Sequence, residues 1–262
     1  MDLYDMNNKV LVVTGAASGM GRAFASLSIK LGAVGVTAVD KEKKGLDELD
    51  ANFQDAKDRL MTVHLNVCDE NGVIKMLQDT VKRFGRIDGC FNHAGIGSCM
   101  AETIDMPTEE FRKVIENNVL GPFYVLKHTL RIMKAQGYGA IVNTASLLSV
   151  RGMAKTLEYS TSRGAVLAMS RCAALEAAAY GVRVNSLLPG LTDTPINDET
   201  HKGLSPSNPK AAMDAISANI PIGRYATAEE QAQAALFLIS DAASYVSGLD
   251  MLVDGGLSIH CM

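Results

Sequence analysis

Residues 9–21 read KVLVVTGAASGMG, a short apolar run that enters a glycine-rich turn. The apolar part is typical of a buried strand, and residues 22–30, which follow the turn, have the pattern of a helix. Strand, glycine turn and helix open a βαβ unit. Backbone N–H groups and the helix dipole at such a turn can hold a pyrophosphate, so this stretch predicts a dinucleotide site.

The glycines Gly15, Gly19 and Gly21 are spaced G-x-x-x-G-x-G, which matches the general dinucleotide fingerprint only in part. Asp40 strengthens this interpretation because it ends the second β-rich run, about 20 residues after the last glycine. An acidic residue there bonds the adenosine ribose and repels a 2′-phosphate. The sequence therefore favours NAD(H) over NADP(H) as cofactor.

The rest of the chain alternates between the two patterns. Strands are expected at 34–39, 60–65, 87–92, 140–144 and 183–188, and helices at 41–52, 73–84, 109–133, 159–180 and 228–239. This predicts a single Rossmann-type domain over residues 1–262, a doubly wound α/β fold with a parallel sheet and helices on both faces. Residues 191–220 hold three prolines and no clear period, which is typical of a functional loop, and we expect a substrate loop there.

Composition narrows the possible functions. The net charge of −4 gives no basic footprint for nucleic acid or an anionic membrane, and no apolar run approaches the ~20 residues of a membrane span. The amino terminus is acidic where a secretory signal would be basic. The five cysteines include no CxxC pair and the five histidines are scattered, which favours a reduced, cytoplasmic protein with no metal site.

Tyr159 and Arg163 are four residues apart in a helical stretch, which places them on one face. A fixed cation stabilises the phenolate of a nearby tyrosine, and an acid/base residue for an alcohol needs that form. Taken alone, such a pair is more often an ordinary surface feature.

In combination, the motifs resemble those of the short-chain dehydrogenases/reductases. The features that carry the resemblance are, in chain order, Thr14-Gly15 through Gly21, Asn92-His93-Ala94-Gly95, Asn118, Ser146, Tyr159 to Arg163, Pro189-Gly190 and Asp254-Gly255-Gly256. Their order and spacing match over nearly the whole chain. The resemblance implies an oxidoreductase that interconverts a secondary alcohol and a ketone with NAD(H).

The resemblance also implies residue roles. Tyr159 would be the general acid/base, Ser146 would orient and polarise the carbonyl oxygen, and Asn118 would organise the helix and a proton-relaying water. Ser146 could instead simply cap the chain after its strand, and Asn118 could be a buried helix amide. The implied cofactor-binding residues are Gly15, Ser18, Gly19, Met20, Gly21, Asp40, Asn66, Val67, Asn92, Ala94, Gly95, Tyr159, Arg163, Pro189, Gly190, Thr192 and Thr194.

Three positions depart from the family pattern. Asn66 stands where aspartate is frequent, His93 where asparagine is usual, and Arg163 where the family has lysine. Arginine keeps the positive charge but cannot pass a proton along a relay. Because Asn118, Ser146 and Tyr159 remain together, a working enzyme is favoured. The alternative is an NAD(H)-binding regulatory or scaffold protein with impaired catalysis.

The substrate is expected beside Tyr159, in contact with Ser146, Leu148 and Met153. An apolar wall there favours a small hydrophobic alcohol or ketone, such as a cyclic or terpenoid one, while sugar and acyl-carrier substrates stay open. The wall would comprise Leu147, Leu148, Val150, Met153, Leu191 and Ile196. Family members are commonly tetramers through the helices corresponding to 109–133 and 159–180, so a homo-oligomer, tetramer or dimer, is expected.

Overall fold

The computed structural model describes residues 5–195 and 207–260. Within them, seven parallel strands form one sheet in the order β3-β2-β1-β4-β5-β6-β7. The strands are β1 (Val10–Thr14), β2 (Gly35–Asp40), β3 (Leu60–His64), β4 (Gly89–Asn92), β5 (Gly139–Thr144), β6 (Val182–Pro189) and β7 (Asp250–Val253). The chain reverses its direction of travel across the sheet between β1 and β4. Ligands of doubly wound folds bind at such a switch point, beyond the carboxyl ends of the strands.

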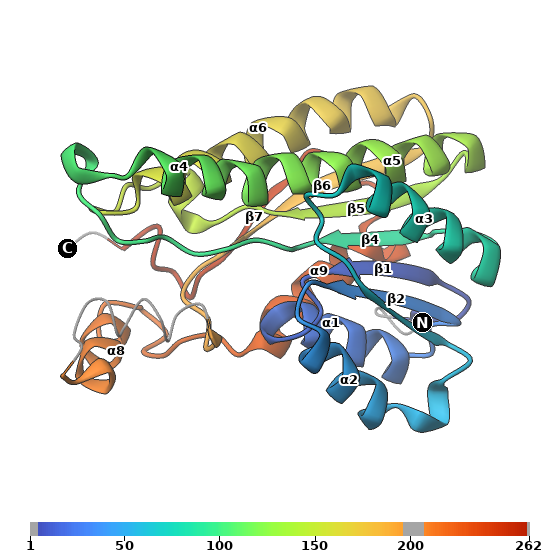
Figure 1. Cartoon of the computed structure of the whole chain (residues 1–262), viewed down its shortest axis with the longest axis horizontal. Helices are drawn as coiled ribbons and strands as arrows, with labels where there is room; N and C mark the ends of the chain where they lie inside the picture. The colour runs from blue at the N-terminus through green and yellow to red at the C-terminus, as the bar shows by residue number, and fades with distance from the viewer. Residues whose placement is uncertain (1–4, 196–206, 261–262) are drawn as a thin grey trace.

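Helices cover both faces of the sheet, as Figure 1 shows. One layer contains α1 (Gly19–Lys30), α2 (Lys43–Asn52) and α9 (Ala228–Ile239), and the other contains α3 (Glu70–Phe84), α5 (Gly121–Gln136) and α6 (Leu157–Ala178). A buried apolar cluster packs each helix layer onto the sheet. One cluster contains Phe24 and Phe91, and the other contains Met76 and Ile141. The predicted fold class is therefore confirmed.

The helix expected at 109–133 differs from the observed structure. It is divided into α4 (Thr108–Ile115), one π-helical turn η3 (Glu116–Leu120) and α5. The extra residue of a π turn changes the direction of the side chains on it, and such turns are frequent at functional sites. Here the turn carries Asn118, which points inward and is fully buried.

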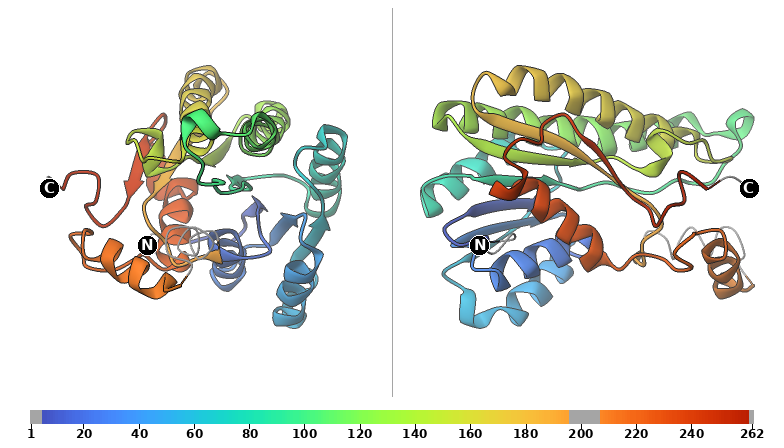
Figure 2. Two further views of the ribbon diagram at one scale, coloured as in Figure 1. Left: turned by 60° about the vertical axis from the view of Figure 1, so that its left-hand side comes forward. Right: turned by 180° about the vertical axis from the view of Figure 1, so that it is seen from behind.

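Two further elements were not predicted. The strand β7 extends the sheet beyond β6, and the helix α8 (Pro209–Ser217) lies inside the segment expected to be a loop. Asn208 caps α8 by accepting a hydrogen bond from the Ala211 N–H, and a proline in the first turn suits a helix start. Figures 1 and 2 place α8 beyond the carboxyl ends of the strands, apart from the two helix layers. Residues 196–206 of the expected substrate loop lie outside the described residues.

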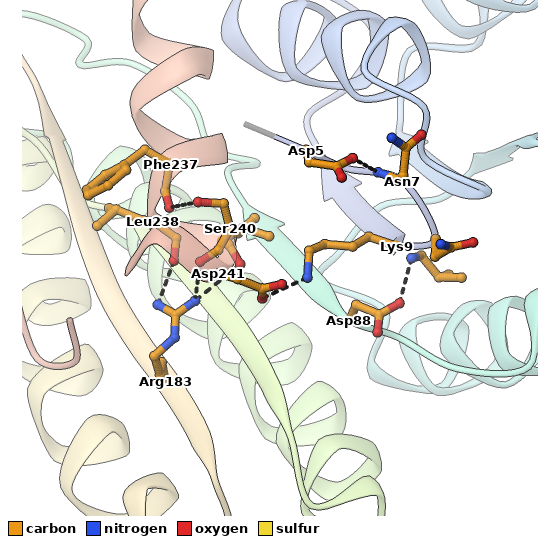
Figure 3. A network of polar contacts seen from close by, with 12 residues as sticks. Asp5, Asn7, Lys9, Asp88, Arg183, Phe237, Leu238, Ser240 and Asp241 are labelled. Carbon is orange, nitrogen blue, oxygen red and sulfur yellow. Dashed lines mark hydrogen bonds and ion pairs between the residues drawn. The ribbon is translucent and has the colours of Figure 1, made fainter. Parts of the chain in front are cut away.

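Near the amino-terminal ends of the strands, a polar network around Arg183 holds α9 against the sheet (Figure 3). The Arg183 guanidinium donates hydrogen bonds to the carbonyl oxygens of Leu238, Ile239 and Ser240 at the end of α9, at 2.7 to 3.1 Å. Lys9, just before β1, pairs with Asp241 at 2.9 Å. Both contacts lie near the amino-terminal ends of the strands, opposite their carboxyl ends, and they hold α9 against β1 and β6.

Candidate active site

One cavity of about 780 Å³ lies at the carboxyl ends of the strands. Its wall includes residues at or just after the carboxyl ends of β1, β2, β4, β5 and β6, among them Gly15, Asp40, Ala94, Ser146 and Pro189. It therefore spans the switch point between β1 and β4. A doubly wound fold places its ligands at this position.

The glycine turn forms a tight cradle at one end of the cavity. Gly15 and Gly19 have left-handed backbones, with φ of +77° and +51°. A Cβ atom at Gly21 would lie 2.1 Å from the Gly15 carbonyl oxygen, so α1 can begin this close to β1 only with glycine there. Ser18, the residue before α1, makes no side-chain capping bond to the helix. The first N–H groups of α1 thus keep their capacity to bind an anion such as a phosphate.

The Asp40 carboxylate is held at the end of β2 by two backbone donors. Its Oδ2 accepts from the Ala17 N–H and its Oδ1 from the Glu42 N–H, both at 2.9 Å. The carboxylate lines the cavity close to the glycine turn and is suited to accept hydrogen bonds from hydroxyl groups. This part of the wall carries both signs of charge, from Arg22, Lys41, Glu42, Lys44 and Glu48.

The segment after β4 is fixed to β1 by Thr14. The Thr14 hydroxyl oxygen accepts hydrogen bonds from the N–H groups of His93 and Ala94, both at 3.0 Å. Ala94 and Gly95 line the cavity. Asn92 is buried instead, and its side-chain amide donates to the Pro122 carbonyl and the Asn143 side chain at 2.8 Å. Asn92 thus joins β4 to β5 and α5 and lies outside the cavity wall.

Asn118 joins the same segment to α6. Its Oδ1 accepts from the Ile96 N–H at 2.8 Å, while its Nδ2 donates to the Ile96 carbonyl at 2.9 Å and to the Ser162 hydroxyl at 3.1 Å. The side chain is fully buried and lies outside the cavity wall. In this arrangement Asn118 holds neighbouring backbone in place, and its expected part in a proton relay stays a prediction.

Ser146 and Tyr159 both line the cavity. Ser146 follows β5 and caps the short helix η4 (Leu147–Ser149), and its hydroxyl oxygen accepts from the Leu148 N–H at 3.1 Å. Within the described residues the hydroxyl donates no hydrogen bond, so capping and a role toward a substrate oxygen are compatible. Tyr159 lies in the first turn of α6.

Arg163 lies one turn after Tyr159, with its guanidinium carbon 5.1 Å from the centre of the Tyr159 ring. The side chain is only 3% exposed, and its Nη1 donates to the Thr144 carbonyl at 3.0 Å. A Cβ atom at Gly95 would lie 2.3 Å from its Nη2, so the guanidinium fits against a glycine. Its Nε has no hydrogen-bond partner among the described residues.

His93 lines the cavity beside these residues. Its Nδ1 lies 3.0 Å from the Thr144 hydroxyl, and its ring stacks on Phe91 with centroids 4.9 Å apart. Burial first, and then the charge of Arg163, lower the pKa of His93 to about 3. The imidazole is therefore neutral near pH 7. Ser146, Tyr159 and the Arg163 cation remain the side chains here that suit chemistry on an alcohol.

The cavity unites most of the predicted site residues. It is lined by Gly15, Ser18, Gly19, Met20, Asp40, Ala94, Gly95, Ser146, Leu148, Met153, Tyr159, Arg163, Pro189, Gly190, Thr192 and Thr194. Gly21, Asn92 and Asn118 support the wall from behind. Asn66 is exposed and Val67 packs against Gly121, and these two expected cofactor-binding residues lie outside the wall.

The expected apolar wall is present in part. Leu147, Leu148, Met153 and Leu191 line the cavity, whereas Val150 is half exposed outside it and Ile196 lies outside the described residues. Sequence reasoning missed Ser98 and Met100, although their position just after β4 was a usable signal. It also missed Ile216 of α8, which no motif marks, and Leu257, which directly follows the Asp254-Gly255-Gly256 motif. Among residues 5–195 and 207–260, no group of three or more His, Cys, Asp or Glu side chains could hold a metal ion, and no helix could span a membrane.

Comparison with known proteins agrees with this architecture. A family model described as enoyl-(acyl carrier protein) reductase matches residues 15–258. Levodione reductase of Leifsonia aquatica is 39% identical over 256 residues, which cover 96% of this chain and 94% of that protein. Cis-4-hydroxycyclohexanecarboxylate dehydrogenase of Sinomonas cyclohexanicum is 40% identical over 248 residues, with 95% and 96% covered.

Solved structures give the same result. A crystal structure of levodione reductase superposes with a TM-score of 0.94 at 36% identity, covering 97% of this chain and 99% of that one. The structure of NAD⁺-bound xylitol dehydrogenase gives a TM-score of 0.89 at 32% identity, with 96% and 99% covered. Fold and cavity define a Rossmann-type oxidoreductase. The chain belongs to the short-chain dehydrogenases/reductases, within the group described by the matching model.

Proposed function

We propose that this protein is an NAD(H)-dependent enzyme that interconverts a secondary alcohol and a ketone on a small hydrophobic substrate. The observation that carries the proposal is one cavity that joins the glycine cradle and Asp40 to Ser146, Tyr159 and Arg163. The nicotinamide group would supply the hydride acceptor or donor, while the protein supplies orientation and the proton. The proposal includes a cytoplasmic location and a homo-oligomer.

The residues present fit NAD(H). The close approach of Gly21 to Gly15 leaves a backbone cradle for the pyrophosphate, and the fixed Asp40 carboxylate suits the adenosine ribose. Pro189, Gly190, Thr192 and Thr194 would hold the nicotinamide end. The NAD⁺ named in the xylitol dehydrogenase structure supports the same cofactor.

Tyr159 would take the proton from the alcohol oxygen during oxidation and return it during reduction. Ser146 would donate a hydrogen bond to the same oxygen. The Arg163 guanidinium lies beside the Tyr159 ring, and its Nε, which has no hydrogen-bond partner among the described residues, suits an acceptor group of a bound ligand. Resemblance to the family places lysine at this position, and arginine keeps its charge without a transferable proton.

Apolar side chains favour a hydrophobic substrate. The cavity that Ser146 and Tyr159 line is also lined by Leu147, Leu148, Met153, Leu191, Ile216 and Leu257. The name of one relative specifies a hydroxycyclohexanecarboxylate as substrate, which supports a secondary alcohol on a six-membered ring. We therefore propose cyclic alcohols and ketones as the first class to test.

The deciding experiment is NAD-dependent oxidation of a panel of cyclic secondary alcohols across pH, with the native chain, Tyr159→Phe and Arg163→Lys. We expect turnover in the native chain and a loss of about 100-fold or more in kcat for Tyr159→Phe, because the proton acceptor is gone. NADH binding, measured by fluorescence, should persist in that variant. A silent native chain that binds NADH and becomes active only as Arg163→Lys would instead indicate a nucleotide-binding protein with impaired catalysis.

The cofactor preference has its own test. Asp40→Asn removes the charge but keeps an oxygen that can accept from Ala17 or Glu42. We expect NADPH affinity to rise about tenfold relative to NADH affinity, because repulsion of the 2′-phosphate is relieved. An unchanged ratio of the two dissociation constants would contradict the role given to Asp40.

A further inference from the structure

Glu158 is a buried carboxylate directly before Tyr159. The side chain is 0% exposed, although glutamate is rarely buried without partners. Its Oε1 accepts hydrogen bonds from the Ser98 hydroxyl at 2.7 Å and from the Cys99 N–H at 2.8 Å. Its Oε2 has no hydrogen-bond partner among the described residues. Such burial is costly, and the two bonds to Oε1 are the direct compensation that the structure provides.

Those two bonds hold a segment of the cavity wall. Gly97, Ser98 and Met100 line the cavity, and they follow β4 with no helix or strand of their own. The Ser98 hydroxyl oxygen also accepts from the Met100 N–H at 3.0 Å. The segment 97–100 is therefore fastened to α6 mainly through the side chain of Glu158.

The backbone on both sides of this contact is strained. Met100 has a φ of +58° and Lys155 a φ of +68°, in the left-handed region that non-glycine residues seldom adopt. The Ser98 hydroxyl also approaches the Lys155 carbonyl at 3.1 Å, so its single proton lies nearer to the Glu158 carboxylate. Strained conformations persist where surrounding contacts impose them, and the Ser98 hydroxyl that Glu158 holds contacts both of these residues.

We propose that Glu158 is a positioning residue that fixes segment 97–100 as a wall of the substrate cavity beside Tyr159 and so determines which substrates fit. This inference rests on the proposed function, because it assigns specificity to the same cavity. Glu158 itself is given no proton-transfer step, since it is fully buried and does not line the cavity. Its effect should therefore fall on substrate binding and leave the chemical step nearly unchanged.

The test compares Glu158→Leu, which removes the acceptor, with Glu158→Gln, which keeps an acceptor oxygen for Ser98 and Cys99. Hydrogen exchange of the Cys99 amide reports on the anchor without any substrate. We expect at least about tenfold faster exchange in Glu158→Leu, as for the loss of a hydrogen bond to a charged group, and near-native exchange in Glu158→Gln. Glu176→Gln, an exposed carboxylate on the same helix, is the matched control.

Steady-state kinetics with a bulky cyclic alcohol give the second readout. In Glu158→Leu, KM for the alcohol should rise about tenfold, with kcat within about threefold and NADH affinity unchanged, and Glu158→Gln should restore native KM. Ser98→Ala removes one of the two bonds and should raise KM by a smaller factor, which keeps the test decisive if Glu158→Leu fails to fold.

Three results would overturn the proposal: native Cys99 exchange without the acceptor, native KM in both Glu158→Leu and Ser98→Ala, or a loss confined to kcat. A native enzyme without turnover would refute the proposed function instead. In that case the exchange measurement still decides whether Glu158 anchors the segment.

Discussion

At the scale of single residues, the buried Arg163 guanidinium leaves no room for a side chain at Gly95. A Cβ atom at Gly95 would lie 2.3 Å from Arg163 Nη2 and 3.0 Å from Asn118 Oδ1. We therefore expect Gly95→Ala to displace the guanidinium and to destabilise the protein by about 1–3 kcal/mol, measured by urea unfolding. Gly164→Ala is the matched control, because nothing lies within 4 Å of a Cβ there. Equal stability of the two variants would contradict this packing.

A single residue, His93, also makes the free energy of unfolding depend on pH. The pKa of His93 is lowered from 6.5 to about 3 in the folded protein, so between these values the unfolded chain binds the extra proton. Stability from this residue is thus complete above pH 6.5 and falls as the pH drops toward 3, by at most about 1.4 kcal/mol per pH unit. We expect His93→Asn to lose less stability than the native chain between pH 7 and pH 5. Parallel pH profiles in urea unfolding would refute this, and His64→Asn, at an exposed histidine, is the control.

At the scale of elements, Arg183 joins the end of α9 to β6. It donates to carbonyl groups of the last turn of α9, which have no partners within the helix. Arg183→Met keeps the apolar stem but removes the donor to the Leu238 and Ile239 carbonyls, so we expect a loss of about 2–4 kcal/mol in the free energy of unfolding. Arg171→Met, which removes an exposed pair with Asp250, should cost less than about 1 kcal/mol. Activity per folded molecule should equal that of the native protein, because this network lies at the amino-terminal ends of the strands and the cavity at their carboxyl ends.

Some elements and contacts could be predicted from the sequence, and others could not. For strands and helices with a clear apolar period, the predicted bounds lie within a few residues of the observed ones. The glycine turn, Asp40 and the Tyr159–Arg163 pair could also be recognised from the sequence, because each is a local pattern. The π turn was not predicted, because the Asn118 side chain that it carries forms hydrogen bonds with Ile96 and Ser162, which are distant in sequence. The contact between Ser98 and Glu158 spans 60 positions and has no local signature. The strand β7 is short and only partly buried, so it shows no alternation.

At the scale of the whole molecule, α5 and α6 lie side by side (Figures 1 and 2). Both helices carry exposed apolar side chains. Leu175 on α6 is 82% exposed, and Phe123 on α5 is 40% exposed. Of the alanines on α6, Ala173, Ala174 and Ala177 pack into the core of the same chain, whereas Ala168 and Ala178 are exposed, as is Ala179 directly after the helix. The outward set is available for close approach of a second copy.

We therefore expect the native protein to be a dimer or tetramer through this surface, and Leu175→Glu to shift it toward the single chain. A charge buried at such a contact is costly unless it is paired, so the contact should weaken strongly. Light scattering coupled to size-exclusion chromatography measures the mass directly. Ile104→Glu, at an equally exposed apolar residue outside both helices, should leave the mass unchanged. If the native chain is already single, or if Leu175→Glu keeps the native mass, the two helices do not form the contact, and their exposed apolar residues need another explanation.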